Sequence, residues 1–584
     1  MSTTPIDGDA SRFSIQISSA TLHSGEELRF PKNGVTVIVG PNNAGKSTFL
    51  RELSGHLKHG NRTRQMEMQR TIASIQLSCT GSADDAFAWF SKHAKTHEPA
   101  PGLQVFKALG FEVLHSSIRD IFSDLADHRG LRDASNFLCF YCDAWQRVSF
   151  IQSQEKRIRQ SEPSGHPLHI LQDRPDLVHE IDAISQQVFG QEITLDSIGK
   201  DLILRVGKSK LPSPKVDEVT EEYWADIESL PEVINQGDGM RSLIGLMLPL
   251  VTASHEVILI DEPEAFLHPP QAFSAGRLLG ELSKSKRTQV ILATHDRSLL
   301  AGLLQSGAEV SIIRLDRSKA GAPLAHQLKT DDLKKIWEDP VLRYTNVLDG
   351  LFHKAVILAE AERDCTFYAS TLEDLPNIDG EERLPHEILF VAAGGKDGFP
   401  RLVKLLRSVK VPVVVSPDLD ILNDKNKLRT LVLAMNADWG AFDRNYDRAT
   451  AQFRQPRDKV QIRDVLQSLN SIFENRKEES YTSAVHKEFS AQLRAKESPW
   501  AALKIYGQLA FRTERAAATD LLEGLQRVGI VPVHVGELER FAPSVDVAKG
   551  PAWLPAALAA GAHRSDEARK HLGALLDATS IGYR

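Results

Sequence analysis

The clearest chemical pattern in the chain lies at residues 40–47, which read GPNNAGKS. Two glycines, a lysine and a serine at this spacing are typical of a P-loop, whose backbone N–H groups surround a phosphate. The apolar residues 35–39 and the helix expected at 48–58 supply the strand and the helix that flank such a loop. We expect Lys46 to reach the β- and γ-phosphates of a nucleoside triphosphate and Ser47 to ligate Mg²⁺. The predicted binding residues for this nucleotide, expected to be ATP, are Gly40, Pro41, Asn42, Asn43, Ala44, Gly45, Lys46, Ser47 and Thr48.

Two acids and a histidine further along the chain could complete the chemistry of ATP hydrolysis. Asp261 and Glu262 directly follow the apolar run 257–260, which is the Walker B arrangement. We expect Asp261 to hold the Mg²⁺ shell and Glu262 to orient and deprotonate the attacking water. His295 follows a further apolar run and suits a sensor of the γ-phosphate.

A glycine-rich turn precedes the Walker B run. Residues 234–242 read INQGDGMRS and lead into an apolar helix expected at 243–252. Because the N–H groups at a helix start can bind an anion, Gly237 and Gly239 are predicted to contact nucleotide. The candidates for a nucleotide-sensing glutamine are Gln146, Gln152 and Gln154.

A second set of acids follows apolar runs in the later part of the chain. Runs at 353–358, 387–391 and 411–415 predict parallel strands, and the acids at the ends of the first and third runs are Glu360, Asp364, Asp418 and Asp420. The carboxyl ends of parallel strands meet at one edge of a sheet, so these side chains are expected to converge. Carboxylates suit Mg²⁺, and two such ions could hold the attacking and leaving oxygens of a phosphodiester.

The order of P-loop, glycine-rich turn, Walker B run and histidine resembles the ABC-type ATPase heads of the SMC-like DNA-repair proteins. The stretch 261–271, DEPEAFLHPPQ, resembles the AAA-labelled branch of that group. The resemblance implies a dimer of heads in which the glycine-rich turn of one copy completes the ATP site of the other. This chain has QGDG where the signature of that group usually has serine-glycine-glycine. Arg241 or Asn235 would then take over part of the role of the signature serine.

A glutamate strand end followed by an Asp-x-Asp strand end resembles a Toprim domain. An ATPase followed by a Toprim domain is similar to the layout of the OLD (overcoming lysogenization defect) family of ATP-dependent nucleases, which includes the Gabija nuclease subunit. This resemblance implies that the four acids are ligands of Mg²⁺ or Mn²⁺, and that Lys504 stabilises the transition state. The family commonly has glycine where this chain has Ala361. Glu537 and Glu539, after a last predicted strand at 529–535, either extend the metal site or are solvated.

The expected fold is α/β, with an ABC-type P-loop ATPase domain at 1–345 and a Rossmann-like Toprim domain at 346–584. An inserted subdomain is considered at 155–230 and a helical insertion is expected at 425–500. Shorter elements are predicted as hairpins at 12–30 and 202–215, strands at 71–79 and 136–151, and helices at 83–92, 102–125 and 175–190.

The composition, net charge and cysteines of the chain limit the classes of protein to which it can belong. The chain of 584 residues is 42% hydrophobic and 25% charged, as in globular proteins, and no apolar run is long enough for a membrane span. The net charge of −7 means that a nucleic-acid partner needs a local basic groove; the basic stretch 51–70 is expected to be a solvated surface, with a nucleic-acid contact as the alternative. Cys139 and Cys142 lie in an apolar run without a second pair, so buried thiols in a strand are expected rather than zinc. These features predict a cytoplasmic protein.

Together the patterns predict an ATP-regulated, divalent-metal-dependent endonuclease that acts on nucleic acid, on DNA rather than RNA. The resemblance alone implies a role in bacterial anti-phage defence, self-association as a head dimer or larger assembly, and a second defence subunit as a partner. Two alternatives stay open. One is a repair or sensor ATPase whose Toprim module is not catalytic, for which Ala361 is the reason. The other is a Toprim effector that cleaves tRNA.

Overall fold

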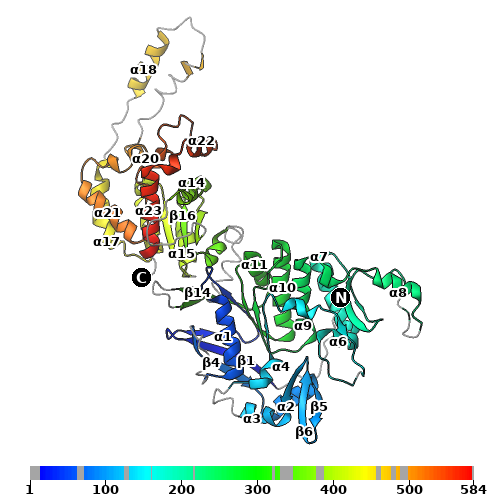
Figure 1. Cartoon of the computed structure of the whole chain (residues 1–584). Coiled ribbons are helices and arrows are strands. Elements are labelled where there is room, and N and C mark those ends of the chain that lie inside the picture. The colour runs from blue at the N-terminus through cyan, green and yellow to red at the C-terminus, as the bar shows by residue number, and fades with distance from the viewer. Residues whose placement is uncertain are drawn as a thin grey trace. The chain divides into compact units, whose positions relative to one another are not determined.

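The computed structural model of the chain forms two compact units, Met1–Tyr344 and Thr345–Arg584 (Figure 1). The structure describes residues 13–61, 71–123, 130–159, 161–212, 214, 218–317, 323–328, 346–375, 387–408, 410–454, 462–474, 482–483, 485–486 and 498–581. The basic residues 62–70 and parts of the predicted insertion at 425–500 therefore lie outside the described residues. None of the described helices combines the length and the apolar composition that crossing a membrane requires.

The first unit is built on a six-stranded sheet in the order β15–β14–β3–β13–β12–β8. The bounds are β3 (Val35–Val39), β8 (Cys139–Cys142), β12 (Val257–Asp261), β13 (Gln289–Ala293), β14 (Val310–Arg317) and β15 (Pro323–Leu328). All neighbours are parallel except β14 and β15. Every residue of the P-loop strand β3 is buried between β13 and β14, which explains its unbroken apolar run. The carboxyl ends of β3, β12 and β13 thus meet at one edge.

Helices connect and cover these strands. The P-loop leads into α1 (Lys46–His59), and the glycine-rich turn leads into the buried helix α9 (Asp238–Thr252). The pair α10 (Pro269–Lys286) and α11 (Arg297–Gln305) follows β12 and β13. The predicted hairpin at 12–30 is present as β1 (Ser14–Leu22) and β2 (Glu27–Arg29), and β4 (Ile72–Thr80) pairs with β1 on its other side. The helix predicted at 83–92 is α2 (Ala83–His93).

The helix prediction at 102–125 is mostly wrong. Only α3 (His115–Ser123) is helical, and an antiparallel sheet of β5 (Lys95–Ala100), β6 (Leu103–Ala108) and β7 (Phe111–Leu114) precedes it. Gly102 and Gly110 stand between these strands with φ values of 79° and 82°. Such positive φ values suit glycine in tight turns and interrupt a helix, so the two glycines decide for a meander of strands.

Of the strand predicted at 136–151, only β8 is a strand. It lies between α4 (Ser135–Leu138) and α5 (Arg147–Phe150). Its apolar run is divided because α5 packs against α9 instead of extending the sheet. Cys139 and Cys142 are the end residues of β8, as predicted; Cys142 is buried, whereas Cys139 is only partly buried.

The hairpin predicted at 202–215 has the wrong partner. β11 (Asp201–Val206) pairs with the preceding strand β10 (Ile193–Asp196) and with β9 (Gln154–Glu155), so the partners come earlier in the chain. Gly207, with a φ of 104°, turns the chain away after β11. The helices of this region are α6 (Pro167–Asp173), α7 (Pro175–Phe189) and α8 (Glu221–Glu228).

The second unit is built on a parallel sheet in the order β17–β16–β18. The strands are β16 (Ala355–Ala359), β17 (Ile388–Ala392) and β18 (Val413–Ser416), each within a few residues of its predicted run. The last predicted strand, 529–535, runs beside β18 but forms only one bridge, between Ile530 and Val415. Pro532 has no N–H to donate, which is tolerated only at a sheet edge.

Helices pack on this sheet and provide its core. Residues of α14 (Glu362–Glu373) and α23 (Asp566–Ile581) share one apolar cluster with β16 and β18, and α15 (Phe399–Ser408) packs against β18. The described part of the predicted insertion is helical, as α16 (Lys425–Ala434), α17 (Gly440–Thr450) and α18 (Ile462–Glu474). Further described helices of this unit include α20 (Ala501–Tyr506), η8 (Gly507–Ala510), α21 (Arg515–Arg527) and α22 (Trp553–Ala559).

Candidate active sites

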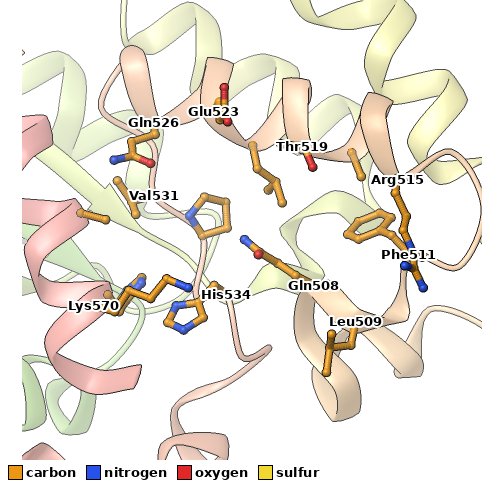
Figure 2. Close-up of a pocket in the computed structure, with 15 residues that line it drawn as sticks. Gln508, Leu509, Phe511, Arg515, Thr519, Glu523, Gln526, Val531, His534 and Lys570 are labelled. Carbon is orange, nitrogen blue, oxygen red and sulfur yellow. The ribbon is translucent and has the colours of Figure 1, made fainter. Parts of the chain in front are cut away.

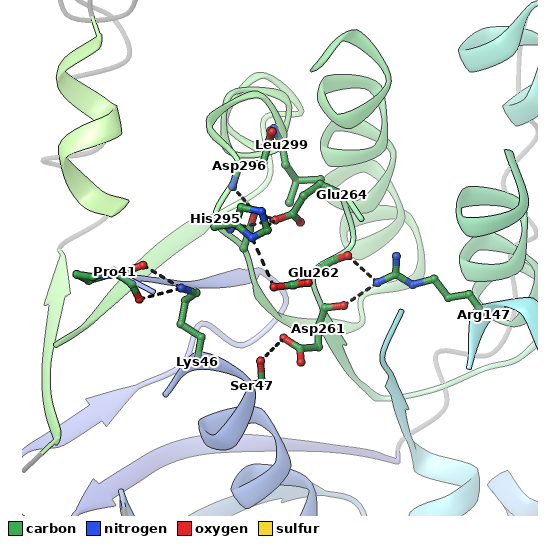
Figure 3. A network of polar contacts seen from close by, with 12 residues as sticks. Pro41, Lys46, Ser47, Arg147, Asp261, Glu262, Glu264, His295, Asp296 and Leu299 are labelled. Atoms are coloured by element: carbon green, nitrogen blue, oxygen red, sulfur yellow. Dashed lines mark hydrogen bonds and ion pairs between the residues drawn. The ribbon is translucent and has the colours of Figure 1, made fainter. Parts of the chain in front are cut away.

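The P-loop residues lie between β3 and α1, where the sequence predicts them. Gly40 has a φ of 144°, and a Cβ there would lie 2.2 Å from the carbonyl oxygen of Leu315, so the close turn requires glycine. The Nζ of Lys46 donates to the carbonyl oxygens of Gly40 (2.9 Å) and Pro41 (3.1 Å), as Figure 3 shows. Burial lowers the pKa of Lys46, and nearby acids oppose that shift. The amine is thus held at the loop, where a phosphate can accept from it.

The two predicted Mg²⁺ ligands of this site contact each other. The hydroxyl of Ser47 donates to Oδ1 of Asp261 over 3.1 Å (Figure 3). Burial raises the pKa of Asp261, while the hydrogen bond from Ser47 lowers it. A hydroxyl and a carboxylate oxygen are the donors that Mg²⁺ prefers, so this pair fits a nucleotide-bound Mg²⁺.

The predicted water-activating acid and the predicted γ-phosphate sensor lie side by side. Nδ1 of His295 is 3.5 Å from Oε1 of Glu262. The parallel pairing of Asp261 with Ala293 brings these two strand ends together. Glu262 adopts a φ of 50°, an uncommon value outside glycine that is typical of functional sites. Its carboxylate remains about half exposed and can reach a water.

Glu264 was not among the predicted site residues. Its side chain is 5% exposed, and Oε1 accepts from the Thr294 hydroxyl (2.7 Å) and from the His295 N–H (3.0 Å). Burial raises the pKa of this carboxyl. Glu264 therefore holds the turn that carries His295. In the sequence, Glu264 is the second glutamate-or-aspartate position of the DEPE motif after Asp261. The local pattern alone does not distinguish it from a solvated surface residue.

We expect Glu264→Ala to destabilise the first unit by about 2 kcal/mol, because the buried Thr294 hydroxyl and the part-buried N–H of His295 lose their acceptor. Glu264→Gln keeps an acceptor oxygen and should cost less than half as much. Thermal unfolding of both variants measures this difference. Equal melting temperatures for the two variants would show that the acceptor at this position does not matter.

Arg147 is a second residue that the sequence did not single out. Its side chain is buried, and Nη2 donates to the carbonyl oxygens of Asp261 (2.6 Å) and Glu262 (2.7 Å). Nη1 donates to the hydroxyl of Ser242 on α9 (2.9 Å), so one guanidinium links α5, the end of β12 and α9. Arg147 directly follows Gln146, one of the three candidate sensing glutamines, and the choice among those three stays open.

The glycine-rich turn caps α9 at some remove from the P-loop. Gly237 is the N-cap residue, and a Cβ on Gly239 would lie 3.0 Å from the carbonyl oxygen of Phe266. Arg241, a candidate for the role of the signature serine, pairs with Asp238 (2.9 Å), while the other candidate, Asn235, donates to Glu232 (3.3 Å). Across the described residues, no hydrogen bond or ion pair joins the turn to the P-loop of its own chain.

The carboxylates of the second unit converge at the ends of β16 and β18. Glu360, Asp418 and Asp420 each offer an oxygen, and these atoms lie within 4.8 Å of one another. One oxygen of Glu360 also accepts from the N–H of Asp418 over 3.0 Å. Burial, together with the neighbouring acids, raises the pKa of Asp418 to about 8. Three carboxylates at this spacing fit a divalent cation such as Mg²⁺ or Mn²⁺.

Asp364, the fourth predicted ligand, lies beside this group rather than in it. Its Oδ2 accepts from the N–H of Ala361 (2.8 Å) and so caps α14. Burial raises its pKa, and Glu539 adds to that shift. Glu537 and Glu539 are 14% and 12% exposed and both contact Lys549, so these acids are partly buried, and the two alternatives for them stay open. Oε1 of Glu539 is buried without a hydrogen-bond partner and lies 3.6 Å from Nη1 of Arg363.

Two lysines contact the two oxygens of Asp420. Nζ of Lys504 lies 3.1 Å from Oδ2, which places this predicted catalytic residue at the carboxylate group. Lys396 contacts Oδ1 and was not predicted. It follows Gly394 and Gly395, whose φ values of 70° and 103° turn the chain back toward Glu360. The sequence feature that could have indicated Lys396 is the GGK turn that follows the middle strand, β17.

Family comparisons match two parts of the chain. Residues 147–301 match the family described as "AAA domain, putative AbiEii toxin, Type IV TA system". Residues 351–420 match "Overcoming lysogenization defect protein-like, TOPRIM domain". The order of these two matches, an ATPase domain followed by an OLD-like TOPRIM domain, matches the OLD-family architecture. The fold of the chain is α/β, an ABC-type P-loop ATPase domain followed by a Toprim domain, and the chain is thus an ATPase that carries a nuclease-type OLD-like domain.

The solved structures that match the chain include ATPase heads, each with a low sequence identity and a TM-score below 0.5. An SMC head bound to the C-winged helix domain of ScpA is 14% identical, covering 55% of this chain and 99% of that chain with a TM-score of 0.34. The SMC head domain from Thermotoga maritima is 16% identical, with coverages of 54% and 98% and a TM-score of 0.28. CbiO1 from Clostridium perfringens, part of the ABC transporter complex cbiONQ, is 13% identical, with coverages of 56% and 93% and a TM-score of 0.26. No curated protein matches the chain.

Proposed function

We propose that this chain is an ATP-regulated, divalent-metal-dependent endonuclease that acts on DNA in bacterial anti-phage defence. The observation that carries the proposal is the group of Glu360, Asp418 and Asp420 in an OLD-like Toprim domain, with Lys504 against Asp420. A divalent cation bound there would supply charge stabilisation and an activated water for phosphodiester hydrolysis.

The residues around the carboxylates have separate roles in this proposal. Glu360, Asp418 and Asp420 hold the cation, and Asp364 is the proposed ligand of a second one. Lys504 supplies positive charge to the phosphate as negative charge develops on it. Lys396 keeps the other oxygen of Asp420 in place from the opposite side.

Ala361 supports a catalytic Toprim domain. Its φ of −140° and ψ of 165° are those of extended backbone, which alanine adopts as readily as other residues. The replacement of the family's usual glycine therefore needs no distortion at this strand end. This removes the main reason for a sensor ATPase with a non-catalytic Toprim module.

The ATPase half of the proposal assigns roles to the residues around the P-loop. Ser47 and Asp261 hold Mg²⁺, Glu262 activates water and His295 senses the γ-phosphate. Gly237 and Gly239 contact the nucleotide of a second copy, so that two chains share each ATP site. Support comes from the exposed N-cap position of Gly237 and from the absence of polar contacts, among the described residues, between this turn and its own P-loop.

Nicking of supercoiled plasmid tests the proposal. Wild type is expected to nick with Mg²⁺ or Mn²⁺ and to change its rate when ATP is added. Lys46→Ala should keep the metal requirement and lose the response to ATP. Total tRNA, incubated in parallel, tests the RNA-cleaving alternative. Cleavage of tRNA without nicking of plasmid would support that alternative. Cleavage of neither substrate would overturn the proposal.

Metal binding should depend on pH through Asp418. A protonated carboxyl is a poor ligand, and the pKa of Asp418 is raised to about 8. Mn²⁺ affinity should therefore rise with pH by up to about tenfold per unit between roughly pH 6 and pH 8, and then level off. Electron paramagnetic resonance of free Mn²⁺ in oxygen-free buffer measures the affinity. Asp418→Asn should bind more weakly and flatten the rise, and an unchanged slope in that variant would assign the proton to another group.

A further inference from the structure

A cavity of about 540 Å³ lies in the Toprim unit between η8, α21 and α23 (Figure 2). Its inner wall is the edge strand at Val531 and Pro532, beside β18. The volume is in the range of small-ligand sites in proteins. None of the carboxylates of the metal site lines it, so the cavity is a separate feature.

The lining combines apolar surface with hydrogen-bonding amides. Phe511, Val531 and Pro532 supply apolar area, while Gln508 and Gln526 each carry a donor and an acceptor. Figure 2 shows Gln508 directed into the cavity from η8. A planar heterocycle with polar edges, such as a nucleobase, matches this combination.

Two cations flank the cavity; neither makes an ion pair among the described residues, and Lys570 interacts electrostatically with Glu567 on the same helix. Among the described residues Lys570 makes no ion pair, and the side chain of Arg515 donates only to the carbonyl oxygen of Phe511 (3.2 Å). The acids nearby are already engaged, Glu523 with Arg527 and Glu567 with His534. Lys570 and Arg515, which lie on opposite sides in Figure 2, therefore favour an anionic ligand.

Backbone hydrogen bonds connect the wall of the cavity to the segment that carries the metal-site aspartates. The N–H of Gln508 donates to the carbonyl oxygen of His534 (2.9 Å), and two residues later the carbonyl oxygen of Gly536 accepts from Leu419 (2.9 Å), between the two metal-site aspartates. Lys504 lies on α20, which leads directly into η8. A nucleotide in the cavity would thus lie close to a phosphate held at the metal site.

Two exposed side chains stand on the same turn. Tyr506 is 55% exposed and Leu509 is 83% exposed. Exposed aromatic and aliphatic side chains beside a cationic site are typical of surfaces that stack on or separate nucleobases.

We propose that this cavity binds one unstacked nucleotide of the substrate strand, next to the phosphate that is cleaved. The substrate class is then single-stranded or locally unpaired nucleic acid, because a fully paired duplex keeps its bases stacked. This inference rests on the proposed nuclease function and specifies its substrate.

Binding in the absence of divalent metal separates this proposal from catalysis. The probes are a fluorescein-labelled oligothymidylate of about 15 nucleotides and a duplex of the same length, both in EDTA, read by anisotropy. Thr519→Trp fills the cavity from an exposed position on α21, and Lys570→Met removes one flanking cation from an exposed position on α23. Each variant should weaken single-strand binding at least about fivefold and change duplex binding less than twofold. Arg564→Met, which removes a cation near the start of α23 outside the cavity, is the matched control and should bind as wild type does.

The outcomes distinguish the cavity from the nuclease. Wild-type affinity for the single strand in both Thr519→Trp and Lys570→Met overturns the cavity proposal, even if wild type nicks plasmid. Equal losses on single strand and duplex also overturn it, because they indicate a general charge effect. Selective loss of single-strand binding supports the cavity, even if wild type cleaves nothing and the nuclease proposal fails. Unchanged melting temperatures of the variants show that they fold.

Discussion

Asp418→Asn is expected to lower metal-dependent nicking of supercoiled plasmid by about 10³-fold, which corresponds to roughly 4 kcal/mol of transition-state stabilisation. Asp418 is the most perturbed acid of the carboxylate group, since burial and its acidic neighbours raise its pKa to about 8. Asparagine keeps the size of the side chain and removes the charge that a divalent cation would neutralise. ATP hydrolysis should persist, because its chemical groups belong to the other unit.

A matched control comes from the same unit. Asp374 pairs with His563 and Arg564 and takes no part in the carboxylate group. Asp374→Asn should therefore nick at the wild-type rate. If Asp418→Asn nicks as fast as Asp374→Asn, the carboxylate group is not the nuclease site, and a contaminating nuclease becomes the explanation of any cleavage.

Glu262→Gln is expected to lower ATP turnover by about 10²–10³-fold while ATP binding is retained. The carboxylate of Glu262 reaches solvent beside His295, whereas Lys46, Ser47 and Asp261 are the residues proposed to contact phosphate and Mg²⁺. The variant should accumulate in the ATP-bound state. If two heads share each ATP, gel filtration with ATP should show a dimer of Glu262→Gln that is absent from Lys46→Ala.

Glu281 provides the comparison for this prediction. It is an exposed glutamate on α10, 3.7 Å from Arg277, and Glu281→Gln should hydrolyse ATP normally. Full turnover by Glu262→Gln would mean that another group activates the water. In that case the buried Glu264 would be the next candidate, since it also lies near His295.

Local pattern was sufficient for the parts of both sites that follow single strands. β3, β12 and β13 are buried on both faces, so their apolar runs and the polar residues after them are visible in the sequence. The same holds for β16 and β18, which carry Glu360 and Asp418 at their ends. In each case the chemistry sits within a few residues of the signal that predicts the element.

The tertiary structure alone decided which distant side chains complete these sites. Arg147 reaches Asp261 and Glu262 across more than a hundred residues of chain, and no local pattern marks it. Lys396 and Lys504 contact the two oxygens of Asp420, although one precedes Asp420 in the sequence and the other follows it. Such contacts depend on how separate elements pack, which periodicity does not encode.

The errors have a related physical cause. At 102–125 two glycines with positive φ outweighed the helix pattern, and their backbone geometry follows from turns that only the folded sheet requires. Asp364 is not an error of this kind: its carboxylate caps α14 and lies next to Glu539, and its role as a metal ligand stays a prediction. The sequence by itself determined the two kinds of site and the strands that carry them, because each depends on short-range pattern. Only the tertiary structure decided their full sets of contacting residues and the cavity beside the metal site, because these arise from packing between elements far apart in the chain.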